Sequence, residues 1–108
     1  MWYEQDPEIE HDTRVVDLKQ VMMTPAILRA VKRAGGKVKE KDYEKDPHPA
    51  PTPLSEDIAK LDFFEGTPVK VREHGDFYRI IDGRHRVAAM LLKNFRQISV
   101  EVVSDNLI

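Results

Sequence analysis

The segment from Pro68 to Val103 constrains the fold most, because its apolar residues change period along the chain. Val69 and Val71 alternate with charged residues, as in a strand that buries one face. A glycine-containing loop at 74–76 then predicts a hairpin. The expected elements are strands at 68–73, 77–81 and 97–103 and a helix at 84–94, whose buried stripe is Val87, Ala88 and Leu91. Strands alternating with a helix predict a sheet that a helix covers.

The first half of the chain predicts one further strand and one further helix. The β-rich run 14–18 indicates the strand. Thr24-Pro25 has the form of a helix start, with a hydroxyl N-cap and proline at the first helical position. Gly35-Gly36 ends this helix, because glycine adopts the left-handed C-cap conformation without strain.

A proline-rich stretch separates the two halves. Prolines at 47, 49, 51 and 53 remove backbone donors and restrict the residues before them, which excludes a helix or a central strand there. We therefore expect residues 37–53 to form a long loop and to be the most mobile internal segment. Ser55, with acidic residues after it, predicts a short helix at 55–61.

The order of the expected elements indicates an α+β fold with a small mixed β-sheet and packed helices, and the length indicates one domain. The chain has 108 residues, which suffices for a single core. We expect an acidic N-terminal tail at 1–12 and one domain at 13–108. No apolar run is long enough for a membrane span, and the absence of cysteine excludes disulfides and thiolate sites. No membrane partner and a cytoplasmic location are expected.

Charge is distributed unevenly, although the net charge is only −2. The tail is acidic and could bind a partner protein. Residues 29–45 carry seven basic and three acidic residues. This basic stretch is either a solvated surface or an electrostatic site for phosphates, with non-specific DNA binding as one outcome. Its candidate nucleic-acid contacts are Arg29, Lys32, Arg33 and Lys37.

The turn Asp82-Gly83-Arg84-His85-Arg86 carries the strongest chemical signal. A strand that ends in Asp-Gly and runs straight into a helix presents unsatisfied backbone N–H groups, which together with the helix dipole attract anions. Cations at this end of a helix are unfavourable by a few tenths to about 1 kcal/mol each unless something compensates them. A bound phosphate is one compensation. The alternative is that the arginines pair with Asp82, Glu65 or Glu73 while His85 is a satisfied, half-buried histidine.

The pattern from Leu54 to Val103 resembles the ParB-like/sulfiredoxin superfamily. The shared features are a short helix, a proline-initiated strand, a hairpin, the Asp82-Gly83-Arg84-His85-Arg86-Val87-Ala88-Ala89 turn and helix, and a final strand. Two departures are clear, because Arg84 replaces the sulfiredoxin cysteine and no helix-turn-helix domain follows. The stretch between Ala34 and Leu54 also matches nothing in the family pattern.

The resemblance implies that this turn binds nucleotide phosphates, since the family includes CTP-hydrolysing partition proteins, ATP-dependent sulfiredoxins, free-serine kinases and proteins described as nucleases. ATP or CTP, with Mg²⁺, is the expected ligand, and phosphoryl transfer or nucleotide hydrolysis is the expected activity. The alternatives are a DNA-binding or nuclease-type accessory protein of phage, plasmid or chromosome maintenance, and a non-catalytic regulator that binds a partner protein. The candidate phosphate-binding residues are Gly83, Arg84, His85 and Arg86. The candidate catalytic residues are Asp82, His85 and Glu65, with Asp82 also the candidate metal ligand.

Overall fold

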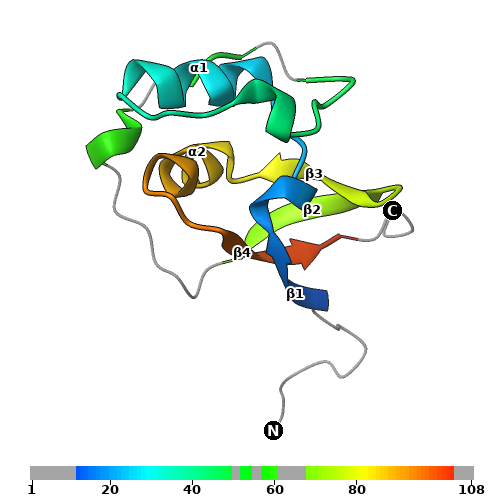
Figure 1. Ribbon diagram of the computed structural model, residues 1–108. Helices are drawn as coiled ribbons and strands as arrows, with labels where there is room; N and C mark the ends of the chain where they lie inside the picture. The colour runs from blue at the N-terminus through cyan, green and yellow to red at the C-terminus, as the bar shows by residue number, and fades with distance from the viewer. Residues whose placement is uncertain (1–11, 50–51, 55–56, 61–67, 104–108) are drawn as a thin grey trace, which may run out of the picture.

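A four-stranded mixed sheet forms one layer of the protein in a computed structural model, which describes residues 12–49, 52–54, 57–60 and 68–103 (Figure 1). The strands lie in the order β1-β4-β2-β3, with β1 and β3 at the edges. β4 runs antiparallel to β1 and parallel to β2, while β2 and β3 form an antiparallel hairpin. The bounds are β1 Asp12–Asp17, β2 Val69–His74, β3 Phe77–Asp82 and β4 Gln97–Val102. The α+β class with a small mixed sheet is confirmed.

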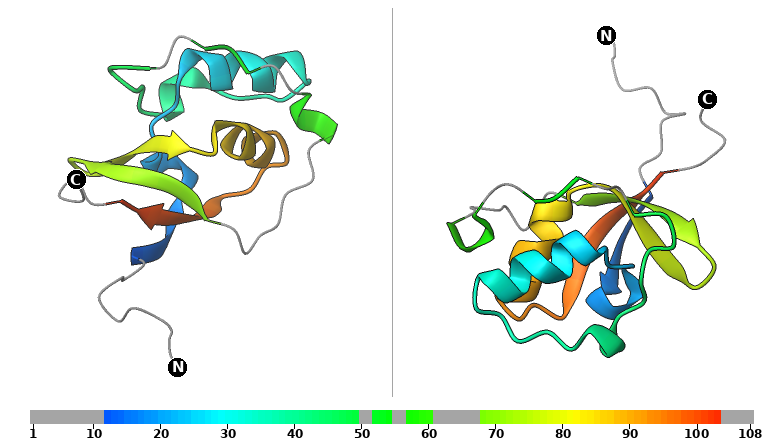
Figure 2. Two further views of the ribbon diagram at one scale, coloured as in Figure 1. Left: turned by 180° about the vertical axis from the view of Figure 1, so that it is seen from behind. Right: turned by 90° about the horizontal axis from the view of Figure 1, so that it is seen from above.

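Two helices cover one side of this sheet (Figure 2). α1 spans Pro25–Arg33 and α2 spans Arg84–Leu92. In the connections that the structure describes lie three short 3-10 turns, η1 Leu18–Gln20, η2 Glu40–Asp42 and η3 Ile58–Lys60. None of the helices in the described part of the chain is long and apolar enough to cross a membrane.

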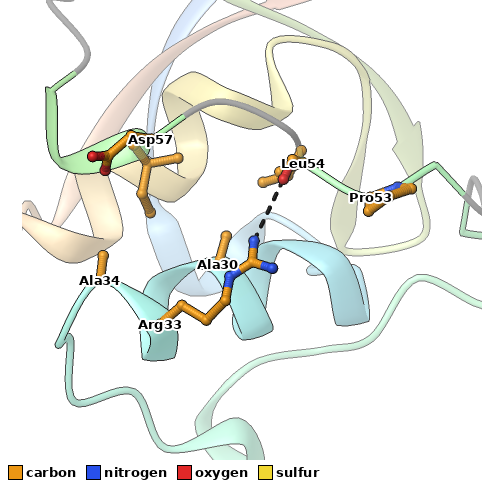
Figure 3. Close-up of a pocket in the computed structure, with 7 residues that line it drawn as sticks. Ala30, Arg33, Ala34, Pro53, Leu54 and Asp57 are labelled. Atoms are coloured by element: carbon orange, nitrogen blue, oxygen red, sulfur yellow. Dashed lines mark hydrogen bonds between the residues drawn. The ribbon is translucent and has the colours of Figure 1, made fainter.

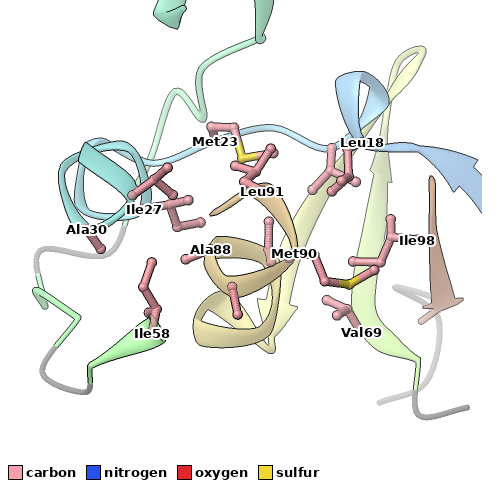
Figure 4. Packing of buried hydrophobic residues seen from close by; sticks show 14 of the residues in the cluster. Leu18, Met23, Ile27, Ala30, Ile58, Val69, Ala88, Met90, Leu91 and Ile98 are labelled. Atoms are coloured by element: carbon pink, nitrogen blue, oxygen red, sulfur yellow. The ribbon is translucent and has the colours of Figure 1, made fainter. Parts of the chain in front are cut away.

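α2 lies between α1 and the sheet, which explains why more of it is buried than the predicted stripe of Val87, Ala88 and Leu91 (Figure 4). Five consecutive residues, 87–91, are buried, because one side of the helix meets α1 and the other meets the strands. Ala88 and Ala89 are fully buried, and their small side chains allow this close approach on two sides. The core therefore continues from Ile27 of α1 through Leu91 of α2 to Ile98 and Val100 of β4.

The predicted helix ends agree with the structure to within two residues. The Thr24 side chain caps α1 by accepting a hydrogen bond from the Ile27 N–H at 3.2 Å. Gly35 follows α1 with φ +92°, as expected of a left-handed C-terminal glycine. α2 ends at Leu92 rather than 94, because Asn94 adopts the left-handed conformation with φ 64°. β1 begins at Asp12, inside the predicted tail, and the rest of that tail lies outside the described residues.

The segment after α1 is less irregular than the sequence predicts, because part of it pairs with the segment before α1. That earlier segment lies along the β3 edge of the sheet, where Val21 bridges to Tyr78. Residues 44–46 then pair with Met23, whose N–H donates to the Glu44 carbonyl at 2.8 Å and whose carbonyl accepts from the Asp46 N–H at 2.9 Å. These bonds attach the middle of the long connection to the segment before α1. Of the predicted helix at 55–61, the structure describes only the 3-10 turn η3, and the cap residue Ser55 lies outside the described residues.

Candidate functional site

The turn between β3 and α2 is built around Gly83. This residue has φ +113°, a conformation that L side chains rarely adopt. A Cβ at this position would also lie 3.1 Å from both methyl groups of Val69, which is buried in β2. The close contact and the backbone conformation both require glycine, so the predicted Asp-Gly turn from strand to helix is confirmed.

Cations occupy the first turn of α2, which contains no acidic residue. Gly83 offers no side chain to cap the helix, and the first backbone N–H groups of an α-helix have no acceptor within the helix. Arg84, His85 and Arg86 are all half-buried at this end. The local charge and the helix dipole therefore have the same sign, as the sequence predicts.

Arg84 donates from Nη1 to the backbone carbonyl of Thr52 at 2.8 Å. This partner is neutral, and within the described residues Arg84 makes no ion pair of the kind that the alternative explanation requires. Of the proposed carboxylates, Glu73 accepts instead from Arg14 at 3.3 Å, and Glu65 lies outside the described residues. A guanidinium whose partner in the described part of the chain is a carbonyl can exchange that acceptor for an anion, because charge-assisted hydrogen bonds are the stronger ones.

His85 has one buried ring nitrogen without a partner. Its Nε2 atom is inaccessible to solvent and makes no hydrogen bond to any part of the chain that the structure describes. Burying such a group without a partner is unfavourable by about 1–3 kcal/mol. The histidine is therefore not the fully satisfied residue of the alternative explanation.

Asp82 lies at the exposed end of β3, where its Cα pairs with that of Lys70 in β2. Within the described ranges, no three His, Asp or Glu side chains gather as a metal-binding group would. One carboxylate together with phosphate oxygens can nevertheless hold Mg²⁺, which keeps several of its waters in protein sites. The metal and catalytic roles of Asp82, and the catalytic role of Glu65, stay predictions.

A cavity of about 500 Å³ opens between α1 and the segments before and within η3 (Figure 3). The Arg33 guanidinium points from α1 toward the Leu54 carbonyl, to which Nη2 donates at 3.4 Å, and Asp57 lies on the facing segment. Pro53 and Leu54 in the wall directly follow Thr52, the residue that holds Arg84. The remaining lining residues, Ala30, Ala34 and Ile58, are apolar.

The candidate nucleic-acid residues differ in the partners that the structure gives them. Lys32 makes an ion pair with Glu40 of η2 at 2.8 Å, and Arg33 is bound to Leu54. Arg29 is exposed and lies beside Glu40 in a small hollow, and Lys37 is exposed. Glu40 lies close to several of these cations, and the hydrogen bond from Lys32 lowers the pKa of its carboxyl group. DNA binding by this stretch stays a prediction.

One polar contact near the turn was not foreseen from the sequence. Arg79 of β3 donates from Nε to the Asp46 carboxylate at 3.0 Å and from Nη2 to the His48 carbonyl at 3.1 Å. Asp46 also accepts from the His48 N–H at 2.9 Å, and its side chain is only 6% exposed. The Asp46-Pro47 dipeptide is a turn signal, but nothing in the sequence pairs it with a residue 33 positions later.

No protein-family model matches this chain, and neither the characterised proteins nor the solved structures give a significant match.

Proposed function

We propose that the turn from Asp82 to Arg86 binds the phosphate groups of a nucleotide, ATP or CTP. The observation that carries this proposal is the first turn of α2, which holds two arginines and a histidine but no acidic residue, and in which Arg84 donates to the neutral carbonyl of Thr52. A phosphate group in this position would compensate both the charge of the Arg84 guanidinium and the helix dipole. The resemblance to the ParB-like/sulfiredoxin superfamily supports the same ligand.

Each residue of the turn has a separate task in this proposal. Gly83 allows the phosphates to approach the backbone, and the N–H groups that follow it donate to phosphate oxygens. Arg84 and Arg86 bind non-bridging oxygens with two donors each. His85 donates to an oxygen or transfers a proton. The cavity beside Thr52 is large enough for the remainder of a nucleotide.

Phosphoryl transfer or nucleotide hydrolysis at this site would depend mainly on position and charge. Arg84 and Arg86 would stabilise the negative charge of the transferred group. Asp82 or Glu65 would accept the proton of the attacking hydroxyl group or water. Mg²⁺ held by Asp82 and the phosphates would supply additional positive charge.

Thermal denaturation with and without ATP, CTP and inorganic tripolyphosphate tests the proposal. A ligand that binds only the folded state raises its stability, by about 2.7 kcal/mol at a concentration one hundred times the Kd. We expect at least one nucleotide to raise the Tm. Parallel measurement of released phosphate, with and without Mg²⁺ and DNA, separates a binding protein from a hydrolase.

Arg84→Glu is the decisive variant. It loses an exposed hydrogen bond to Thr52 but places a carboxylate where the helix dipole favours one, so the empty protein should keep nearly its original Tm. Its Tm should no longer respond to nucleotide, because the carboxylate repels phosphate. Lys41→Glu, which makes the same charge change at an exposed position in η2, should keep the response. A wild-type protein that ignores all three ligands, or an equal loss in both variants, contradicts the proposal.

A further inference from the structure

A second cavity, of about 400 Å³, lies beyond the opposite end of α2 from the glycine turn. Three separate parts of the chain form it: the junction of β1 with η1, the residue after η2, and the turn between α2 and β4. A backbone hydrogen bond from the Leu18 N–H to the Arg96 carbonyl, at 2.9 Å, joins two of these parts. The lining residues are Asp17, Leu18, Lys19, Tyr43, Phe95 and Arg96.

Two aromatic rings contribute to the walls. Phe95 is 37% exposed, so part of its surface faces the cavity. Its position is fixed by the end of α2, where the left-handed Asn94 allows the Phe95 N–H to donate to the Met90 carbonyl at 3.0 Å. Tyr43 packs partly against the core, and this burial, followed by the charge of Asp42, raises the pKa of its phenol. The second ring is therefore neutral at ordinary pH.

The rim carries more positive than negative charge. Lys19 and Arg96 are both exposed, and neither makes an ion pair with another residue in the described part of the chain. Asp17 is the single carboxylate among the lining residues. Leu18, which is 2% exposed, adds an apolar side chain from the core to the lining. The cavity thus combines aromatic surface with two cations that are available to a ligand.

We propose that this cavity binds a small planar aromatic molecule that carries a carboxylate or a phosphate group. The ring of the ligand packs against Phe95 and Tyr43, which favours flat aromatic surfaces over saturated ones. Arg96 binds the anionic group with two donors, and Lys19 adds a second positive charge. Asp17 favours ligands that also offer a hydrogen-bond donor. The volume lies within the range of small-molecule sites and is too small for a folded partner.

An NMR titration of the ¹⁵N-labelled full chain tests this proposal with benzoate and phenyl phosphate as probes. Cyclohexanecarboxylate supplies the same charge without an aromatic ring, and benzamide supplies the ring without the charge. We expect saturable shifts of the amides at 17–20, 43–44 and 95–97 with both aromatic anions, and weaker binding of the two control compounds. Absence of saturable shifts there, or equal binding of cyclohexanecarboxylate, overturns the proposal.

Variants at the rim and the wall identify the cavity as the site. Arg96→Gln should weaken the binding of phenyl phosphate about tenfold, since a hydrogen bond to a charged group contributes on this scale. Phe95→Ala should weaken the binding of both aromatic anions by a similar factor, while Lys60→Gln, an exposed change in η3, should leave it unaltered. Arg96→Gln should also keep the response of the Tm to nucleotide, and Arg84→Glu should keep the binding of benzoate. Equal binding by Arg96→Gln and wild type contradicts the assignment.

Discussion

Gly83 shows how a single residue determines the geometry of the candidate site. Its φ of +113° turns the chain from β3 into α2, and its missing Cβ leaves room for the two methyl groups of Val69 at 3.1 Å. Gly75, in the hairpin loop, also has a positive φ, of +62°, but a Cβ there would meet nothing within 4 Å. At Gly75 a side chain would therefore meet only backbone strain, whereas at Gly83 it would meet both backbone strain and a steric contact.

Replacing each of these glycines by alanine should give different losses of stability. Gly75→Ala should lower the free energy of unfolding by about 1 kcal/mol, from backbone strain alone. Gly83→Ala should lower it by about 2–3 kcal/mol, because the new methyl group must also displace Val69. Urea denaturation of both variants measures the difference, and equal losses would contradict the role of the Val69 contact.

Glu40 provides a second test at the residue scale. Its pKa lies below the ordinary value of 4.5, first because of the hydrogen bond from Lys32 and then because of the charges of Lys32 and Lys45. In Lys32→Met we expect this pKa to rise toward 4.5, as measured by NMR titration of the side-chain carboxyl group. Lys45→Met should raise it less, since the Lys45 nitrogen lies 4.0 Å from Glu40 compared with 2.8 Å for Lys32.

The sign of the effect on stability follows from the direction of this shift. A carboxyl group whose pKa is lowered by folding stabilises the protein above its ordinary pKa and loses that contribution as the pH falls through the folded value. The difference in stability between wild type and Lys32→Met should therefore be largest above the ordinary value and should shrink in more acidic solution. A difference that grows as the pH falls would show that the ion pair is not its cause.

At the scale of elements, α1 begins where the sequence predicts because Thr24 caps it. The Thr24 side chain is almost fully buried and accepts from the Ile27 N–H. Thr24→Ala should lower the free energy of unfolding by about 1 kcal/mol. Thr24→Ser keeps the hydroxyl group and should recover most of this loss in the same denaturation experiment. Equal destabilisation by both variants would assign the effect to the lost methyl group.

α2 shows that the apolar period of a helix does not predict how many elements the helix packs against. A helix with one apolar stripe is expected to cover a sheet, and Val87, Ala88 and Leu91 satisfy that pattern. Its polar residues are confined to the first turn, however, so Ala89 and Met90 were also available for burial against a second element. Whether α1 packs on α2 or directly on the sheet depends on long-range contacts, and a helical period carries no information about them.

For the whole molecule, the sequence predicts the elements and the turn better than the contacts between distant segments. Caps, glycines and alternating valines act locally, which is why the strands, both helices and the Gly83 turn were placed correctly. The bond from Arg84 to Thr52 and the pairing of Met23 with Lys45 join segments that no local pattern connects. The second cavity depends on three such segments and was not predicted, although Phe95 beyond the end of α2 was noted.

The connection at 37–53 was predicted to be the most mobile internal segment, and limited proteolysis tests that prediction. The structure attaches it to β3 through the Asp46 carboxylate, which binds the Arg79 guanidinium and the His48 N–H. Asp46→Ala removes a buried acceptor from both donors, so we expect it to lower the free energy of unfolding by about 1–3 kcal/mol. It should also accelerate cleavage within 40–49.

Two control variants accompany this test. Asp46→Asn keeps an acceptor but loses the charge, so its stability and its cleavage rate should lie between those of wild type and Asp46→Ala. Asp76→Ala, in the exposed hairpin loop, should change neither property. Cleavage of Asp46→Ala at the wild-type rate would show that this carboxylate does not hold the segment in place.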